Sequence, residues 1–160
     1  MPTATAYSQY TAVMAKIRVS TTIDAPVAEV WEYVRCIQSH TEWMADAESI
    51  SFCSDQTEGL GTQFNCVTKI GPIKLTDQMV ITQWIEQSCI GVRHQGLVTG
   101  EGRFTLSPAG TNRSQFCWTE ELHFPLWMGG PLRNIVGGRI LEWVWRRNLK
   151  TLRSHFAALA

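Results

Sequence analysis

Residues 47–124 alternate between apolar and polar side chains with a period of two, and this pattern constrains the fold more than any other feature. Glycine or proline interrupts the alternation at intervals, as expected for strands separated by turns. The connections are too short for parallel neighbours, which need a long crossover, so we expect antiparallel hairpins. The six strand-like runs span about residues 47–54, 61–71, 74–85, 88–98, 101–108 and 113–124.

A seventh strand and two short helices are predicted before this region. Residues 16–25 alternate in the same way, which is typical of a strand with one solvated face. Pro26 suits the first position of a helix, where a missing N–H costs nothing. Apolar residues then recur three and four positions apart in 26–37, which predicts an amphipathic helix that plugs one end of the sheet. Residues 39–44 predict a further helical turn.

The last twenty residues have the pattern of a long helix with one apolar and one basic face. The complete order is therefore strand, two short helices, six strands and a long helix. This order predicts an α+β fold in which a seven-stranded, curved antiparallel sheet surrounds the C-terminal helix. The apolar face of that helix would consist of Ile140, Leu141, Val144, Trp145, Leu149, Leu152, Phe156 and Leu159.

Length and composition favour one globular domain. The chain has 160 residues, of which 44% are apolar and 18% charged, and no apolar run is long enough to span a membrane. We interpret residues 1–15 as a flexible N-terminal arm and 16–160 as the single domain. The five cysteines are widely spaced and form no CxxC pair, which argues against a disulfide framework or a zinc site and favours a cytoplasmic location.

Charge is unevenly distributed along the chain. Residues 131–160 contain six basic residues and one acidic residue, whereas residues 1–130 have more acidic than basic groups. The basic face of the long helix can simply be solvated, or it can make weak contact with an anionic membrane surface. No basic stripe interleaved with aromatic residues is present, so nucleic acid is not an expected partner. No motif for a cofactor or a metal is found either.

Several segments resemble a known family. The chain is similar to the SRPBCC superfamily, also called START-like or birch-pollen-allergen-like, over residues 16–158, and within it to the polyketide cyclase/dehydrase subgroup of small bacterial proteins. The segments that carry this resemblance are "TTIDAPVAEVWEYV", "GLGTQF", "LTDQMVITQW", "GEGRFTLSPAG", "SQFCWTEEL" and "RNLKTLRSHF".

The resemblance implies a helix-grip fold with a cavity between the sheet and the C-terminal helix. Members of the superfamily bind lipids, sterols, polyketides or other apolar molecules, and a minority are enzymes. We therefore expect a carrier or sensor of one hydrophobic small molecule, in a pocket of roughly 300–1,000 Å³. The alternative is a polyketide cyclase or dehydratase. Because fold does not determine function, the residues of the cavity have to decide between them.

The alternation of each strand predicts which side chains face the cavity, since the more apolar set points inward. An extra residue in a strand would reverse this assignment. The predicted ligand-binding residues of the strands are Phe64, Cys66, Thr68, Met79, Ile81, Ile90, Val92, Phe104, Leu106, Phe116, Trp118 and Leu122. From the long helix we add Leu141, Val144, Trp145, Asn148, Leu149 and Leu152.

Three ionisable residues, Asp77, His94 and Glu120, fall into this apolar set. A histidine between two carboxylates can act as a general acid and base in dehydration or aldol-type closure, so the three are candidate catalytic residues. The structural alternative has Asp77 holding a turn, Glu120 near solvent at a strand end, and His94 as a hydrogen-bonded core histidine. No nucleophile motif accompanies them.

Exposed aromatic residues are expected near the start of the long helix. Trp127 and Met128 lie in a glycine-rich apolar segment, which can form a lid over the cavity or the contact of a homodimer. Trp143 and Trp145 are two positions apart on a helix and cannot both face the sheet. We expect Trp143 to point away from it.

Overall fold

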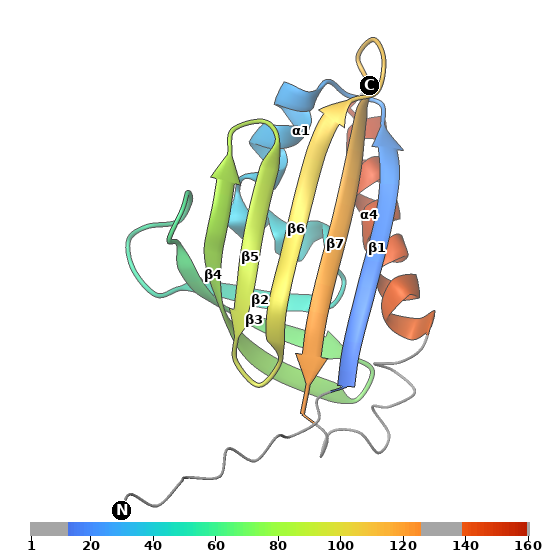
Figure 1. The fold of residues 1–160 in the computed structure, drawn as a ribbon. Helices are drawn as coiled ribbons and strands as arrows, with labels where there is room; N and C mark the ends of the chain where they lie inside the picture. The colour runs from blue at the N-terminus through green and yellow to red at the C-terminus, as the bar shows by residue number, and fades with distance from the viewer. Residues whose placement is uncertain (1–12, 126–138, 160) are drawn as a thin grey trace, which may run out of the picture.

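Alternating strands build most of the molecule, as the sequence predicts (Figure 1). The computed structural model describes residues 13–125 and 139–159. The elements, in chain order, are β1 (Val13–Ile23), α1 (Val27–Val34), the 3-10 turn η1 (Ile37–Ser39), α2 (His40–Trp43), β2 (Ala47–Phe52), β3 (Gln63–Ile70), β4 (Ile73–Ile85), β5 (Cys89–Gln95), β6 (Thr99–Pro108), β7 (Ser114–Phe124) and α4 (Arg139–Ala157).

The seven strands form one antiparallel sheet in the order β1-β7-β6-β5-β4-β3-β2. Strands β2 to β7 are therefore consecutive hairpins, and β1 pairs with the last of them. In Figure 1, β2 and β3 run across the direction of β6 and β7, so the sheet bends strongly, and the helices lie on its concave side. This is the helix-grip arrangement that the resemblance implies. None of the helices described is long and apolar enough to cross a membrane.

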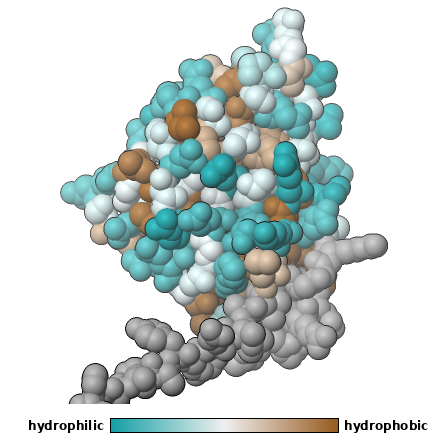
Figure 2. Space-filling view, viewed as in Figure 1, coloured by the Kyte–Doolittle hydropathy of each residue, from teal (hydrophilic) through white to brown (hydrophobic). Residues whose placement is uncertain are grey.

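The two faces of the sheet differ as the alternation requires. Along β1, Lys16 and Arg18 are exposed, whereas Ile17 and Val19 are buried. Figure 2 views the outer face and shows mostly hydrophilic and intermediate residues over it. Strand β1 begins at Val13, so residues 13–15 of the expected arm belong to the sheet. Residues 1–12 lie outside the described part of the chain.

An irregularity in β4 explains how the strand turns past the cavity. The pairing with β5 shifts between Ile81 and Gln83, so Thr82 is an extra residue, a β-bulge. Up to Ile81 the odd-numbered side chains face inward, and after the bulge Trp84 does so, since it pairs with the inward Ile90. The predicted inward set ends at Ile81, before the bulge, and is therefore unaffected by it.

Helix α1 closes one end of the sheet. Its buried residues Val30, Trp31 and Val34 form the predicted apolar stripe. The indole N–H of Trp31 donates to Glu86, which follows β4, with a nitrogen–oxygen distance of 2.7 Å. The hydroxyl of Ser114 in β7 donates to the carbonyl of Ala25 at 2.6 Å and holds the turn that precedes the helix. The helix is shorter than the predicted 26–37, because the chain changes to the 3-10 turn η1.

Helix α4 lies beside β1 rather than over the middle of the sheet (Figure 1). Its buried face includes Leu141, Trp145 and Leu152, while Trp143 is 59% exposed, as expected, with the Arg147 guanidinium 5.5 Å from its ring centre. A buried amide fixes the helix on its other side. Asn148 donates to the Asp46 carboxylate at 2.6 Å and accepts from the backbone N–H of Ala45 at 3.0 Å.

Candidate functional site

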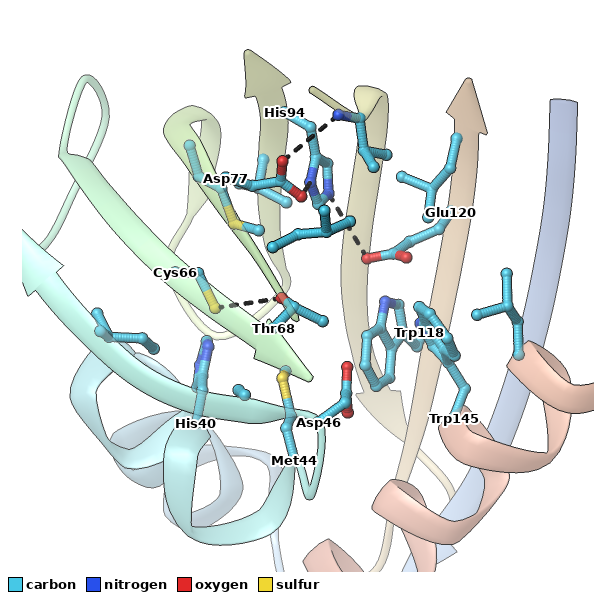
Figure 3. A pocket seen from close by; sticks show the side chains of 18 of the residues that line it. His40, Met44, Asp46, Cys66, Thr68, Asp77, His94, Trp118, Glu120 and Trp145 are labelled. Carbon is cyan, nitrogen blue, oxygen red and sulfur yellow. Dashed lines mark hydrogen bonds and ion pairs between the residues drawn. The ribbon is translucent and has the colours of Figure 1, made fainter. Parts of the chain in front are cut away.

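A cavity of about 130 Å³ lies between the concave face of the sheet and helices α2 and α4 (Figure 3). It is smaller than the 300–1,000 Å³ that we expected. Aromatic side chains fill part of the space between the sheet and the helices and reduce the volume. These rings form a continuous cluster that consists of Trp43, Phe104, Trp118 and Trp145. Their centres are 5.2 Å apart for Phe104 and Trp118, and 5.3 Å for Trp118 and Trp145.

Most of the residues predicted from strand parity line this cavity. The side chains from β3, β4 and β5 form one wall, and those from β6, β7 and α4 form the other. The predicted residues found in the lining are Phe64, Cys66, Thr68, Met79, Ile81, Ile90, Val92, Phe104, Trp118, Leu122, Leu141 and Trp145, together with Asp77, His94 and Glu120.

Other predicted residues lie elsewhere. Phe116 is fully buried and packs against Trp43 and Phe104, whose rings separate it from the cavity. Because α4 packs against β1, the apolar side chains Leu149 and Leu152 in its C-terminal half are buried in the core and do not face the cavity. Asn148 holds the helix through its hydrogen bond to Asp46. The predicted residues outside the lining are Leu106, Phe116, Val144, Asn148, Leu149 and Leu152. Trp127 and Met128 lie outside the described residues.

The sequence analysis missed a group of lining residues for two reasons. Four of them, Ile70, Ile73, Leu75 and Phe124, continue the alternation of their strands by one or two steps and could have been found in this way. Three others come from α2 and the segment after it, where no simple period applies, and Val98 comes from a turn. Ala47 and Ile50 lie in β2, for which no inward set was predicted, and Arg103 lies in β6 next to the predicted Phe104. The lining residues that were not predicted are His40, Met44, Asp46, Ala47, Ile50, Ile70, Ile73, Leu75, Val98, Arg103 and Phe124.

Asp77, His94 and Glu120 meet at one end of the cavity (Figure 3). His94 Nδ1 is 4.0 Å from Asp77 Oδ2, and His94 Nε2 is 3.8 Å from Glu120 Oε1. The side chains of His94 and Glu120 are 8% and 7% exposed. Within the described residues, both ring nitrogens of His94 and Glu120 Oε2 have no hydrogen-bond partner. The His94 ring therefore faces both carboxyl groups at ion-pair distance, and the Glu120 side chain is buried rather than near solvent.

Asp77 does hold a turn, but this turn connects β5 to β6 and is not the turn at Gly71-Pro72 between β3 and β4. Its Oδ1 accepts from the backbone N–H of Val98 at 3.4 Å, in the connection between β5 and β6. Gly96 makes room for this carboxylate, since a Cβ atom there would lie 2.7 Å from Asp77 Oδ1. Gly102 does the same for Glu120, because its Cβ would lie 3.0 Å from Glu120 Oε1. Two glycines thus allow both carboxylates to sit over the backbone beside His94.

Electrostatics within the three residues favours a proton on the imidazole. Burial lowers the pKa of His94, but the attraction of Glu120 and Asp77 outweighs burial, and the pKa lies above its ordinary value. Burial raises the pKa of Asp77, although the His94 charge opposes this. The arrangement can therefore hold a proton and transfer it to a bound molecule.

A second set of polar groups lies at the other end of the cavity (Figure 3). Burial raises the pKa of Asp46, and its hydrogen bond from Asn148 acts in the opposite direction. His40 is different, because burial lowers its pKa to about 4 and leaves it neutral, with Nε2 2.8 Å from the carbonyl of Val34. Burial raises the pKa of the Cys66 thiol to about 11, so it is no nucleophile at neutral pH.

No metal centre emerges from these groups. Over residues 13–125 and 139–159, no three His, Cys, Asp or Glu side chains are placed so as to hold a metal ion.

Comparison with known proteins agrees with this architecture. The profile of a family described as "Polyketide cyclase / dehydrase and lipid transport" matches residues 14–159. No curated protein matches the sequence at a significant level.

Many solved structures have the same fold. The ZhuI aromatase/cyclase from Streptomyces sp. R1128 is 13% identical with a TM-score of 0.73, covering 91% of this chain and 94% of the other. A START superfamily protein from Mycobacterium smegmatis is 14% identical with a TM-score of 0.72, covering 91% and 99%. A protein from Thermus thermophilus is 18% identical with a TM-score of 0.74, also covering 91% and 99%. Likeness at these identities establishes the fold and leaves the chemistry to the site.

The raised pKa of His94 predicts a pH dependence of folding stability. A group whose pKa is higher in the folded than in the unfolded state stabilises the fold at pH values below its unfolded-state pKa, which is 6.5 for His94. This stabilisation is lost as the pH rises through the folded-state pKa. In urea unfolding experiments, the free energy by which the wild type is more stable than His94→Gln should therefore decrease as the pH rises above 6.5. A difference that stays constant or grows with pH would contradict the proposed electrostatics.

Proposed function

We propose that this chain, which belongs to the polyketide cyclase/dehydrase and lipid transport family, binds one small hydrophobic molecule in the cavity between its sheet and helix α4, as a carrier or sensor. The observation that carries the proposal is the void itself. Protein interiors are close-packed, and spaces larger than a few water molecules are uncommon in them. A void of about 130 Å³ with a mainly apolar wall therefore supports the binding of an apolar guest.

Burial of apolar surface would supply most of the affinity, at roughly 25 cal/mol per Å² before the entropic costs of binding. The aromatic wall of Trp118 and Trp145 offers a large contact area. His94 and Glu120 at one end and Asp46 at the other provide a few polar contacts that would orient the guest. This combination of an apolar wall and a few polar groups is the usual form of a small-molecule site.

A cavity-filling substitution tests the proposal. Ala47 is 6% exposed and lines the void, so Ala47→Leu places three further carbon atoms in it. Toluene, a compact apolar probe, should bind the wild type and bind Ala47→Leu at least about tenfold more weakly, as measured by isothermal titration calorimetry.

Ala28→Leu is the matched control, because Ala28 is exposed on α1 and away from the cavity lining. This variant should bind toluene as the wild type does, and circular dichroism should show that both variants are folded. Equal toluene affinity in all three proteins, or no toluene binding by the wild type, would refute the proposal.

A second candidate function is that of a cyclase or dehydratase acting on a polyketide-like molecule. The specific observation in its favour is His94, which is buried between two carboxylates with neither ring nitrogen hydrogen-bonded among the described residues. In a dehydration, a carboxylate beside His94 would remove a proton from the carbon next to a carbonyl group. The hydroxyl on the following carbon would leave as water after accepting a proton from the protonated imidazole of His94.

A small β-hydroxy ketone tests this alternative. Diacetone alcohol loses water to give a conjugated enone, which is followed by its ultraviolet absorbance. If the chain is a dehydratase, the wild type should accelerate this reaction, and His94→Gln should lose the acceleration while retaining toluene affinity. Acceleration that survives in His94→Gln would show that His94 is not the proton donor, and no acceleration by the wild type would count against a dehydratase.

A further inference from the structure

We propose that the guest of this cavity is a neutral molecule of about one six-membered ring that carries a hydroxyl group, and that the site excludes carboxylates and phosphates. This inference rests on the proposed function and specifies the chemical class of the ligand. Three properties of the cavity lead to it, namely its volume, its charge and its unpaired hydrogen-bonding groups.

The volume limits the size of the guest. The cavity measures about 130 Å³, close to the engineered cavity of about 150 Å³ in another protein that accommodates benzene. The rings of Trp118 and Trp145, with centres 5.3 Å apart, form one side of the void and are held by Phe104 and Trp43. A single ring fits this space, whereas a long acyl chain or a fused multi-ring molecule would require the aromatic cluster to rearrange.

The charge of the lining excludes anions. Three carboxyl groups line the void, from Asp46, Asp77 and Glu120, against the imidazoles of His40 and His94. Among the described residues, the one lysine or arginine in the lining is Arg103, which is exposed. The imidazole of His94 already lies 4.0 Å from the Asp77 carboxyl group and 3.8 Å from that of Glu120. Within the part of the chain that the structure describes, a carboxylate or phosphate on the guest would meet these carboxyl groups and no unpaired buried cation, which is costly in an apolar interior.

The unpaired polar atoms identify a group that both donates and accepts hydrogen bonds. In the described part of the chain, Glu120 Oε2 lacks a donor, while the indole N–H groups of Trp118 and Trp145 lack acceptors. Both indoles lie between Glu120 and Asp46 in Figure 3. A hydroxyl can donate to Glu120 and accept from an indole or from His94. A carbonyl oxygen cannot donate a hydrogen bond to Glu120. An ammonium group cannot accept a hydrogen bond from an indole, and its charge would be repelled by the protonated His94.

Four probes with the same ring separate these possibilities. Toluene has no polar group, p-cresol adds a hydroxyl, 4-methylbenzoate adds an anion, and 4-methylbenzylammonium adds a cation. Calorimetry with the wild type should show p-cresol binding about tenfold more tightly than toluene, since one hydrogen bond to a charged group has about that value. The benzoate should bind at least about tenfold more weakly than p-cresol, and the ammonium more weakly than p-cresol.

A pair of isosteric variants locates the hydroxyl. Glu120→Gln should reduce p-cresol affinity about tenfold and leave toluene affinity unchanged, because it removes the charged acceptor with little change of shape. Glu121→Gln is the matched control, since Glu121 is the next residue in β7 but is exposed on the outer face. It should change neither affinity.

Nuclear magnetic resonance gives a readout of the indole groups. In a ¹⁵N-labelled protein, the side-chain N–H signals of Trp118 and Trp145, assigned with Trp→Phe variants, should shift more with p-cresol than with toluene. The Trp143 signal should not respond to either probe, because this ring is 59% exposed on the opposite side of α4.

The outcomes distinguish the two proposals. If toluene and p-cresol both fail to bind, the proposed function and this inference fail together. If toluene binds, but p-cresol binds no more tightly than toluene, or the benzoate or ammonium binds as tightly as p-cresol, the hydroxyl specificity is refuted and the apolar site stands. If Glu120→Gln weakens toluene and p-cresol equally, Glu120 is not the partner of a hydroxyl, and the inference is overturned.

Discussion

The curvature of the sheet determines which part of its concave face is covered by packed side chains and which part borders a cavity. Seven antiparallel strands bend so strongly that one helix cannot cover the whole concave face, and α4 packs at the edge formed by β1. Helix α1 closes one end through Trp31 and Glu86. The wall beneath β3 to β6 is therefore left facing a void, which aromatic rings narrow to about 130 Å³ without filling it. The cavity in this fold is a consequence of incomplete packing.

The polar side chains in the cavity are unusual, because apolar side chains at the same positions would not leave buried hydrogen-bonding atoms without partners. An unpaired buried donor or acceptor costs about 1–3 kcal/mol, and an unpaired charge costs more. His94, Glu120, Trp118 and Trp145 all contain such atoms within the described residues. Gly96 and Gly102, which lack side chains beside the carboxylates, make the arrangement sterically possible. A bound molecule that pairs these atoms would offset this cost.

Much of this could be predicted from the sequence, because the period-two alternation between residues 47 and 124 determines both the strands and their inward faces. That argument alone places Asp77, His94 and Glu120 in one cavity, although they lie on three different strands. The alternation carries no information on how side chains fill space, so the expected volume is too large. It also cannot show that α4 leans on β1, which moves Leu152 and Asn148 away from the void, nor that the irregular segment after α2 brings Asp46 into it.

A crystal pressurised with xenon tests the central claim most directly, since xenon enters dry apolar cavities of this size and is located by its anomalous scattering. The account predicts a xenon site bounded by Phe64, Trp118 and Trp145, with the surrounding side chains in the positions described here. An interior in which these rings have rotated to fill the space, with no xenon between the sheet and α4, would contradict it.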